Sequence, residues 1–229
     1  MSEEILKALM QLFGIIAKQD EGIASDELNF IREFLSRQLS HEKVNEYFHL
    51  FEKIAEIPSY DSDKKDISAR QYRLTSVRDS VKILSICRKI NKTLTREQKI
   101  IVLIRLFELI NINKRYSAQR MAIINTVAEV FNISTDEFES IRRFAALPSP
   151  TVHPDPNLVI IGSSAPGPDQ ITFISRESVS GEVFILRIPS VDLYFLKYSG
   201  KDLVTLNGME VFPDRIYLFA SGSALRFPK

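Results

Sequence analysis

Cysteine and histidine, the residue types most often used for nucleophilic attack and for zinc binding, are rare in this chain. The one cysteine, Cys87, has no partner for an internal disulfide, and it lies in a segment of helical periodicity where a small packed residue is more common than a nucleophile. His41 and His49 are eight residues apart on one helix face, a spacing that suits no common pair of metal ligands. We expect these side chains to be structural or solvated.

The glycine motifs of nucleotide-binding and hydrolytic enzymes are missing from the sequence as well. Gly200-Lys201 is followed by Asp202 and lacks the upstream glycine of a phosphate-binding loop. Gly-x-Gly-x-x-Gly and Gly-x-Ser-x-Gly do not occur. The sequence therefore predicts a chain that is not an enzyme and binds no ATP.

Proline and glycine divide the 229 residues into two parts. Nine of the ten prolines and six of the eight glycines occur from residue 148 onward. Proline is costly inside helices, whereas turns between strands use both residue types. This distribution predicts an α-helical domain over 1–147 and a β domain over 157–229. The segment 148–156 holds four prolines in nine positions, which favours a semi-rigid linker.

The overall composition is that of a folded globular protein. A formal net charge of +1 with 26% charged residues excludes a disordered or collagen-like chain. No segment approaches the roughly 20 apolar residues of a membrane-spanning helix. The start, Met-Ser-Glu-Glu, is acidic where a secretory signal is basic. We expect a cytoplasmic location.

Seven helices can be placed in the first domain from apolar spacing and capping residues. Capping boxes begin at Thr95 and Ser134, while Ser25, Ser40 and Ser117 are candidate caps of three further helices. The helices are expected around residues 6–16, 25–35, 40–51, 77–84, 95–109, 117–131 and 134–144. One long loop is expected over residues 59–68.

A faint internal repeat relates the first helices to later ones. Leu12-Phe13 aligns with Leu106-Phe107, and, after a one-residue gap, Ile23-Ala24-Ser25 aligns with Tyr116-Ser117-Ala118 and Leu28 with Met121. Each copy is an apolar helix, a polar turn and an amphipathic helix. A chance match between two amphipathic helix pairs stays open as the alternative.

The stretch Leu12-Phe-Gly-Ile-Ile-Ala-Lys-Gln-Asp-Glu-Gly-Ile-Ala-Ser-Asp-Glu-Leu28 resembles the signature of the TerB-like helical domain, a family associated with tellurite resistance. The resemblance covers about residues 1–147 and implies a seven-helix, all-α fold. In that family, acidic residues at two repeated turns resemble a metal site, and several converging oxygen ligands suit a hard divalent cation.

The resemblance implies that Asp20, Glu21, Asp26 and Glu27 are the candidate metal ligands of this chain. The matching second turn reads Asn113-Lys114-Arg115-Tyr116, followed by Gln119 and Arg120, so cations stand where a metal site needs carboxylates. An ordinary helix terminus with acidic first-turn residues is the alternative interpretation.

Charge is unevenly distributed along the helical part. Residues 1–63 hold six Lys/Arg and thirteen Asp/Glu, a balance of −7, whereas residues 64–120 hold fifteen Lys/Arg and four Asp/Glu, a balance of +11. A solvated basic face is one interpretation. Proximity to an anionic membrane surface is the preferred functional interpretation, and a nucleic-acid partner is not expected because few aromatics accompany the charges.

The second domain reads as a small β-sandwich that is short for a complete one, which suggests truncation. Strands are expected at 158–161, 170–174, 182–188, 191–198, 202–206, 215–219 and 224–227, and Asn207-Gly208 is a strong tight-turn signal. Val204-Thr-Leu-Asn-Gly-Met-Glu-Val211 resembles the last strands of a forkhead-associated domain.

That second resemblance implies a phosphopeptide site at Ser163, Ser175, Arg176 and Asn207. Ser163 replaces the family's phosphate-binding arginine and Ser178 replaces its histidine, so a degenerate sandwich that reads no phosphothreonine is the preferred interpretation.

The combination of a TerB-like domain, a proline-rich linker and a degenerate forkhead-associated-like domain resembles the N-terminal region of bacterial ABC transporter ATP-binding proteins. The resemblance implies a non-catalytic regulatory or interaction region, attached to the membrane through a longer parent. It also implies that ATP binding belongs to an ATPase domain beyond residue 229 of that parent. The alternatives are a free-standing, metal-ion-binding stress protein and a phosphopeptide-binding adaptor.

Overall fold

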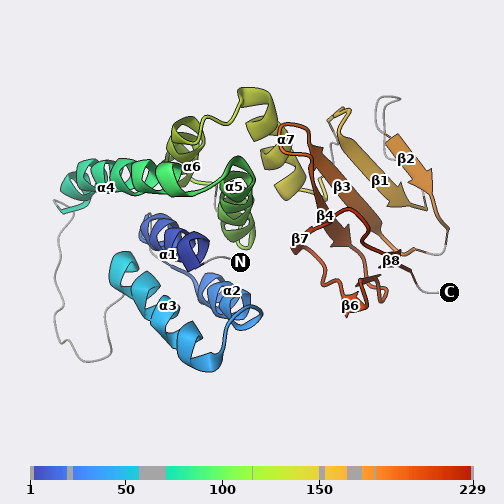
Figure 1. Cartoon of the computed structure of the whole chain (residues 1–229), viewed down its shortest axis with the longest axis horizontal. Coiled ribbons are helices and arrows are strands. Elements are labelled where there is room, and N and C mark those ends of the chain that lie inside the picture. The colour runs from blue at the N-terminus through green and yellow to red at the C-terminus, as the bar shows by residue number, and fades with distance from the viewer. Residues whose placement is uncertain are drawn as a thin grey trace. The chain divides into compact units, whose positions relative to one another are not determined.

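The computed structural model describes residues 3–19, 23–56, 71–114, 116–149, 153–163, 172–177 and 179–227, with the backbone alone for 71–80 (Figure 1). Two compact units divide between Ser134 and Thr135. Within the described residues, the first unit holds six helices and the second holds a seventh helix and eight strands in two sheets. The prediction of a two-domain protein, α-helical and then β, is confirmed.

The six helices of the first unit lie close to the predicted ranges. Their bounds are α1 Glu3–Ala17, α2 Ser25–Ser36, α3 His41–Ala55, α4 Gln71–Thr93, α5 Arg96–Asn111 and α6 Ala118–Val130. None of the helices in the described part of the chain combines the length and apolarity that crossing a membrane requires. The predicted loop at 59–68 lies outside the described residues.

The helices α1 and α5 form the centre of this unit. Both are buried on nearly every side, as a helix that is apolar all round must be. The contacts of α1 extend to α3, α4 and α5, and Figure 1 shows α1 lying between α3 and α4. The two central helices are the first helices of the two repeat copies, which indicates that the repeat organises the core.

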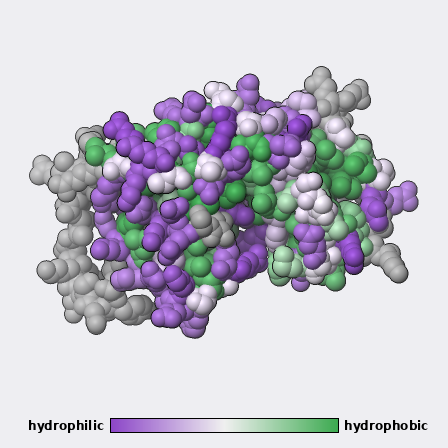
Figure 2. Space-filling model, in the orientation of Figure 1, coloured by the Kyte–Doolittle hydropathy of each residue, from purple (hydrophilic) through white to green (hydrophobic). Residues whose placement is uncertain are grey.

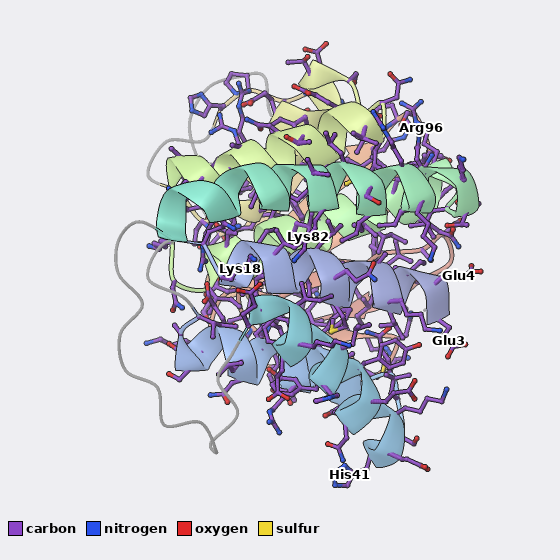
Figure 3. The ribbon with its side chains drawn as sticks, turned by 90° about the vertical axis from the view of Figure 1, so that its left-hand side faces the viewer. Glu3, Glu4, Lys18, His41, Lys82 and Arg96 are labelled. Carbon is purple, nitrogen blue, oxygen red and sulfur yellow. The ribbon has the colours of Figure 1, made fainter. Side chains whose placement is uncertain are left out.

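A glycine sets the closest approach of α1 to α3. A Cβ atom on Gly14 would lie 2.8 Å from Ile54 Cγ2 and 3.1 Å from the backbone nitrogen of Ala55, so only glycine fits without displacement. Ion pairs join the two helices at each end, Glu3 with Lys43 at 3.4 Å and Lys18 with Glu56 at 3.1 Å. The two helices therefore run in the same direction, and Figure 3 shows Glu3 and Lys18 toward opposite ends of α1.

Two of the predicted caps form their expected hydrogen bonds, Ser40 holds the cap position of α3 without a side-chain hydrogen bond, and Ser25 differs from the prediction. The capping box at the start of α5 is confirmed, since Thr95 Oγ1 accepts from the Gln98 amide and Gln98 Oε1 accepts from the Thr95 amide. Ser117 caps α6 by accepting from the Arg120 amide. Ser25 does not cap α2: Ala24 holds that position, and Glu27 Oε2 accepts its amide hydrogen at 2.9 Å.

The second unit contains α7 Thr135–Ala145 and two sheets. The strands are β1 Leu158–Gly162, β2 Thr172–Ser175, β3 Glu182–Ile188, β4 Leu193–Ser199, β5 Thr205–Leu206, β6 Met209–Glu210, β7 Ile216–Leu218 and β8 Leu225–Arg226. The larger sheet has the order β2-β1-β3-β4-β7, antiparallel except for β1 with β2. The smaller sheet has the order β6-β5-β8.

Strand β3 shows how this unit is layered. Val183 and Ile185 face a core shared with the small sheet, to which Val204 and Leu206 contribute. The alternate residues of β3 are also buried, because α7 packs against this strand. The Lys197 ammonium reaches the Ala145 carbonyl at 2.8 Å and so satisfies the last turn of α7.

Packing and sequence assign helix α7 to different parts of the chain. Packing groups it with the strands, so the compact units divide before α7, whereas the predicted domain boundary falls after it at residue 147. Its buried residues Ile141 and Phe144 belong to one apolar face of an otherwise charged helix. An amphipathic helix of this kind fits a helical bundle or one face of a sheet equally well, so its pattern does not identify its partner.

The turn signal at Asn207-Gly208 is confirmed. Both residues have positive φ, 53° and 83°, and they join β5 to β6 as a two-residue hairpin with Leu206 opposite Met209. The strand expected over 202–206 is shorter, and β6 was not expected. On the face in Figure 2, hydrophobic residues gather over β1 and β3, whereas hydrophilic residues predominate over α3.

Candidate functional site

A buried carboxylate lies at the start of α2. Glu27 is fully buried, although glutamate is almost never so unless it is paired. One carboxylate oxygen accepts the Ala24 amide hydrogen, as described above, so it satisfies a backbone donor that the helix start leaves open. Its negative charge also suits the positive end of the helix dipole.

The second oxygen of Glu27 binds an arginine from the start of α6. Arg120 Nη1 donates to Glu27 Oε1 at 2.5 Å, and the Arg120 side chain is itself fully buried. The two residues are 93 positions apart in the chain. This ion pair therefore joins two distant helix starts in the interior of the helical unit.

The two partners occupy equivalent places in the internal repeat. The alignment that matches Ala24 with Ser117 and Leu28 with Met121 also matches Glu27 with Arg120. In the structure Ala24 and Ser117 are the cap residues of α2 and α6, so each charged residue is the third residue of its helix. Because residues at equivalent positions contact each other, the repeat relates these two side chains as well as the helices. We call this contact between the starts of α2 and α6 the junction of the two repeats.

The remaining candidate metal ligands lie elsewhere or outside the described residues. Asp26 is exposed, on the solvent side of the first turn of α2. Asp20 and Glu21 lie outside the described residues, as does Arg115 of the second turn. Among the residues whose side chains the structure describes, no three His, Cys, Asp or Glu gather closely enough to hold a metal ion.

The pairing of Glu27 with Arg120 is the buried contact at the candidate site that the patterns of single segments did not predict. The sequence singled out Glu27 as acidic and Arg120 as a cation near the second turn, but it did not bring them together. The signal that could have found the pair is the repeat itself, because superposing the two copies places both residues at one position.

Three of the four candidate phosphopeptide residues come together. Gly162 of β1 and Ser175 of β2 are partners in the parallel ladder, so Ser163 and Arg176 follow at the same ends of adjacent strands. Ser163, Ser175 and Arg176 are all exposed. The Arg176 guanidinium lies 4.7 Å from the ring centroid of Phe227, and its amide donates to the Gly162 carbonyl.

The fourth candidate, Asn207, lies on the hairpin of the small sheet. Its Oδ1 accepts the Ala224 amide hydrogen at 2.8 Å, and its Nδ2 donates to Ser223 Oγ at 3.2 Å. Both ends of the side chain thus hold the turn that precedes β8. Ser178, the position of the missing histidine, lies outside the described residues.

The basic middle of the chain presents several exposed cations. Lys82, Arg88, Lys89 and Lys92 of α4 are exposed, and so is Arg96 at the start of α5. Figure 3 shows Lys82 on α4 and Arg96 near the beginning of α5. His41 and His49 are exposed on α3, with His49 Nδ1 3.7 Å from Glu52.

Cys87 is buried in α4, and burial raises the pKa of its thiol to about 12. We expect no measurable reaction of the native protein with a disulfide reagent at pH 8 and one reacting thiol after unfolding in urea, because the thiolate is the reactive form. The raised pKa also means that the stability contributed by the neutral thiol is complete below the unfolded value of about 9 and is lost as the pH rises toward 12. Prompt reaction of the native thiol at pH 8 would contradict this burial.

Fold and site together define a helical protein built from two repeated helix pairs, joined through a buried ion pair and carrying a β unit. The family model described as tellurite resistance protein TerB matches residues 6–143, more than half of the chain, and the chain belongs to this family. The matched region covers α2 to α6 and most of α1 and α7. No curated protein and no solved structure shows a significant match.

Proposed function

We propose that this chain is a non-catalytic regulatory or interaction region of an ABC transporter ATP-binding protein. The proposal rests on one observation, that a TerB helical region precedes a β unit of two sheets within the same chain. The TerB domain is not a known catalytic domain, which is consistent with a non-enzymatic role. ATP binding and hydrolysis would then belong to another part of the parent protein.

The charges of α4 support a position near a membrane surface. Four exposed cations on one helix are attracted to anionic lipid headgroups, by about 1 kcal/mol for each cation near the surface. The proposed region would therefore hold its helical unit beside the bilayer while a separate domain of the parent crosses it. This attraction is electrostatic, so concentrated salt weakens it.

An immunoblot of fractionated source cells with an antibody against the purified chain tests this proposal. We expect a species much larger than 26.2 kDa in the membrane fraction. Concentrated salt should leave it in the pellet, because a parent that crosses the bilayer is held by apolar burial, and detergent should release it. Antibody absorbed beforehand with the purified chain is the control.

Two results would contradict the transporter assignment. A species near 26 kDa in the soluble fraction would favour a free-standing stress protein. A species near 26 kDa that concentrated salt alone releases from membranes would indicate a surface-bound protein with no membrane domain.

A further inference from the structure

The junction of the two repeats places one anion and one cation at equivalent positions. Two helix starts converge there, and the third residue of each helix is directed into the protein interior. Two carboxylates at such positions would repel each other unless a cation lay between them. In this chain the cation is part of the sequence, as the guanidinium of Arg120.

The described residues do not fit a divalent ion at Glu27. Its two oxygens are engaged, one by the Ala24 amide and one by Arg120 Nη1. A guanidinium at hydrogen-bond distance excludes a metal ion from the same oxygen, since both carry positive charge and need the same lone pairs. The donor set is therefore that of an internal ion pair.

We propose that Arg120 is a built-in cation that joins the two helical repeats through Glu27, so that this junction is held without a divalent metal ion. The junction then works in a cell irrespective of divalent-ion concentration. A chain with a carboxylate in place of Arg120 would need an external cation with oxygen-ligand chemistry, such as Ca²⁺ or Mg²⁺. This inference is independent of the proposed transporter role.

The full chain and its Arg120→Glu variant test the proposal by thermal unfolding in millimolar CaCl2, in MgCl2 and in EDTA. We expect the Tm of the unmodified chain to be the same in all three. For Arg120→Glu we expect a low Tm in EDTA that rises by about 5 °C or more with CaCl2 or MgCl2, because an ion that binds only the folded state stabilises it.

The variant Arg120→Gln is the matched control, since it removes the cation without adding a carboxylate. It should unfold at a lower temperature than the unmodified chain, with no response to the salts. If Arg120→Glu is isolated unfolded, refolding from urea with and without CaCl2 replaces the thermal measurement, and recovery only with the salt is expected.

Three results would overturn the proposal. The first is a cation-dependent Tm of the unmodified chain that Glu27→Gln abolishes, which would make the acidic turn a metal site. The second is an equal response of Arg120→Glu and Arg120→Gln to the salts. The third is equal failure of Arg120→Glu to refold with and without CaCl2.

Discussion

Replacing Arg120 by methionine is expected to lower the free energy of unfolding of the helical unit by about 3–5 kcal/mol, because Glu27 is then left as a buried charge without its partner. Glu27→Gln should have a similar cost, since it leaves the guanidinium buried while the amide oxygen can still accept from Ala24. The double variant should cost less than the sum of the two, by about 2–3 kcal/mol. Urea unfolding followed by circular dichroism at a helical wavelength measures all three.

Arg37 supplies a matched control for this cycle. It pairs with Glu33 at 2.6 Å, nearly the distance of the buried pair, but both side chains are substantially exposed. Arg37→Met should change stability by no more than about 0.5 kcal/mol, because water already solvates both charges. Equal losses in the free energy of unfolding for Arg37→Met and Arg120→Met would show that burial does not increase the contribution of the Glu27–Arg120 pair to stability.

Local patterns predicted the helices and turns of this protein well. The capping box at Thr95 and the Asn207-Gly208 hairpin each depend on residues within four positions of one another, and each is present as expected. The failure at Ser25 also has a local origin, in the first turn of α2. The carboxylate of Glu27 reaches back to the Ala24 amide, and Ala24 is the cap residue, so the helix begins one residue earlier than a Ser25 cap requires.

Features that depend on distant residues could not be predicted in this way. The partner of Glu27 is 93 positions away, and neither residue alone differs from an ordinary charged residue of a first helical turn. The packing of α7 against β3 is a second case, because its apolar face carries no information about which surface covers it. Long-range pairing is set by the whole fold. In this chain the repeat alignment is the sequence feature that relates the two distant residues.

The repeat also explains why a costly buried pair is tolerated. The helices α1 and α5 form the centre of the unit, and α2 and α6 follow them in the two copies. The ion pair between the starts of α2 and α6 therefore adds to the packing of α1 against α5 in fixing one copy against the other. Charged residues in the interior are expensive, but a paired set specifies one arrangement where apolar residues tolerate several.

Gly181→Ala is expected to lower the stability of the β unit by about 3 kcal/mol or more. Gly181 has a φ of 89°, and a Cβ atom there would lie 1.9 Å from the Ser199 carbonyl oxygen and 2.6 Å from the Gly200 Cα, neither of which can move aside as a side chain can. The neighbouring contacts depend on the same backbone, because the Tyr198 hydroxyl donates to the Ser180 carbonyl and accepts the Asp202 amide hydrogen.

Gly208→Ala separates the two causes of the expected loss of stability, which are the positive φ and the close approach of the added Cβ atom to the backbone. Gly208 also has positive φ, 83°, but nothing lies within 4 Å of its added Cβ, so only the backbone preference is lost, about 1–2 kcal/mol. Amide NMR spectra of the full chain report on the helical unit and on the β unit separately. For Gly181→Ala we expect the signals of residues 153–227 to broaden or collapse while those of α1–α6 persist, because the helical unit is a compact unit of its own. Equal effects of the two substitutions would show that the close approach of Gly181 to Ser199 is not what requires glycine.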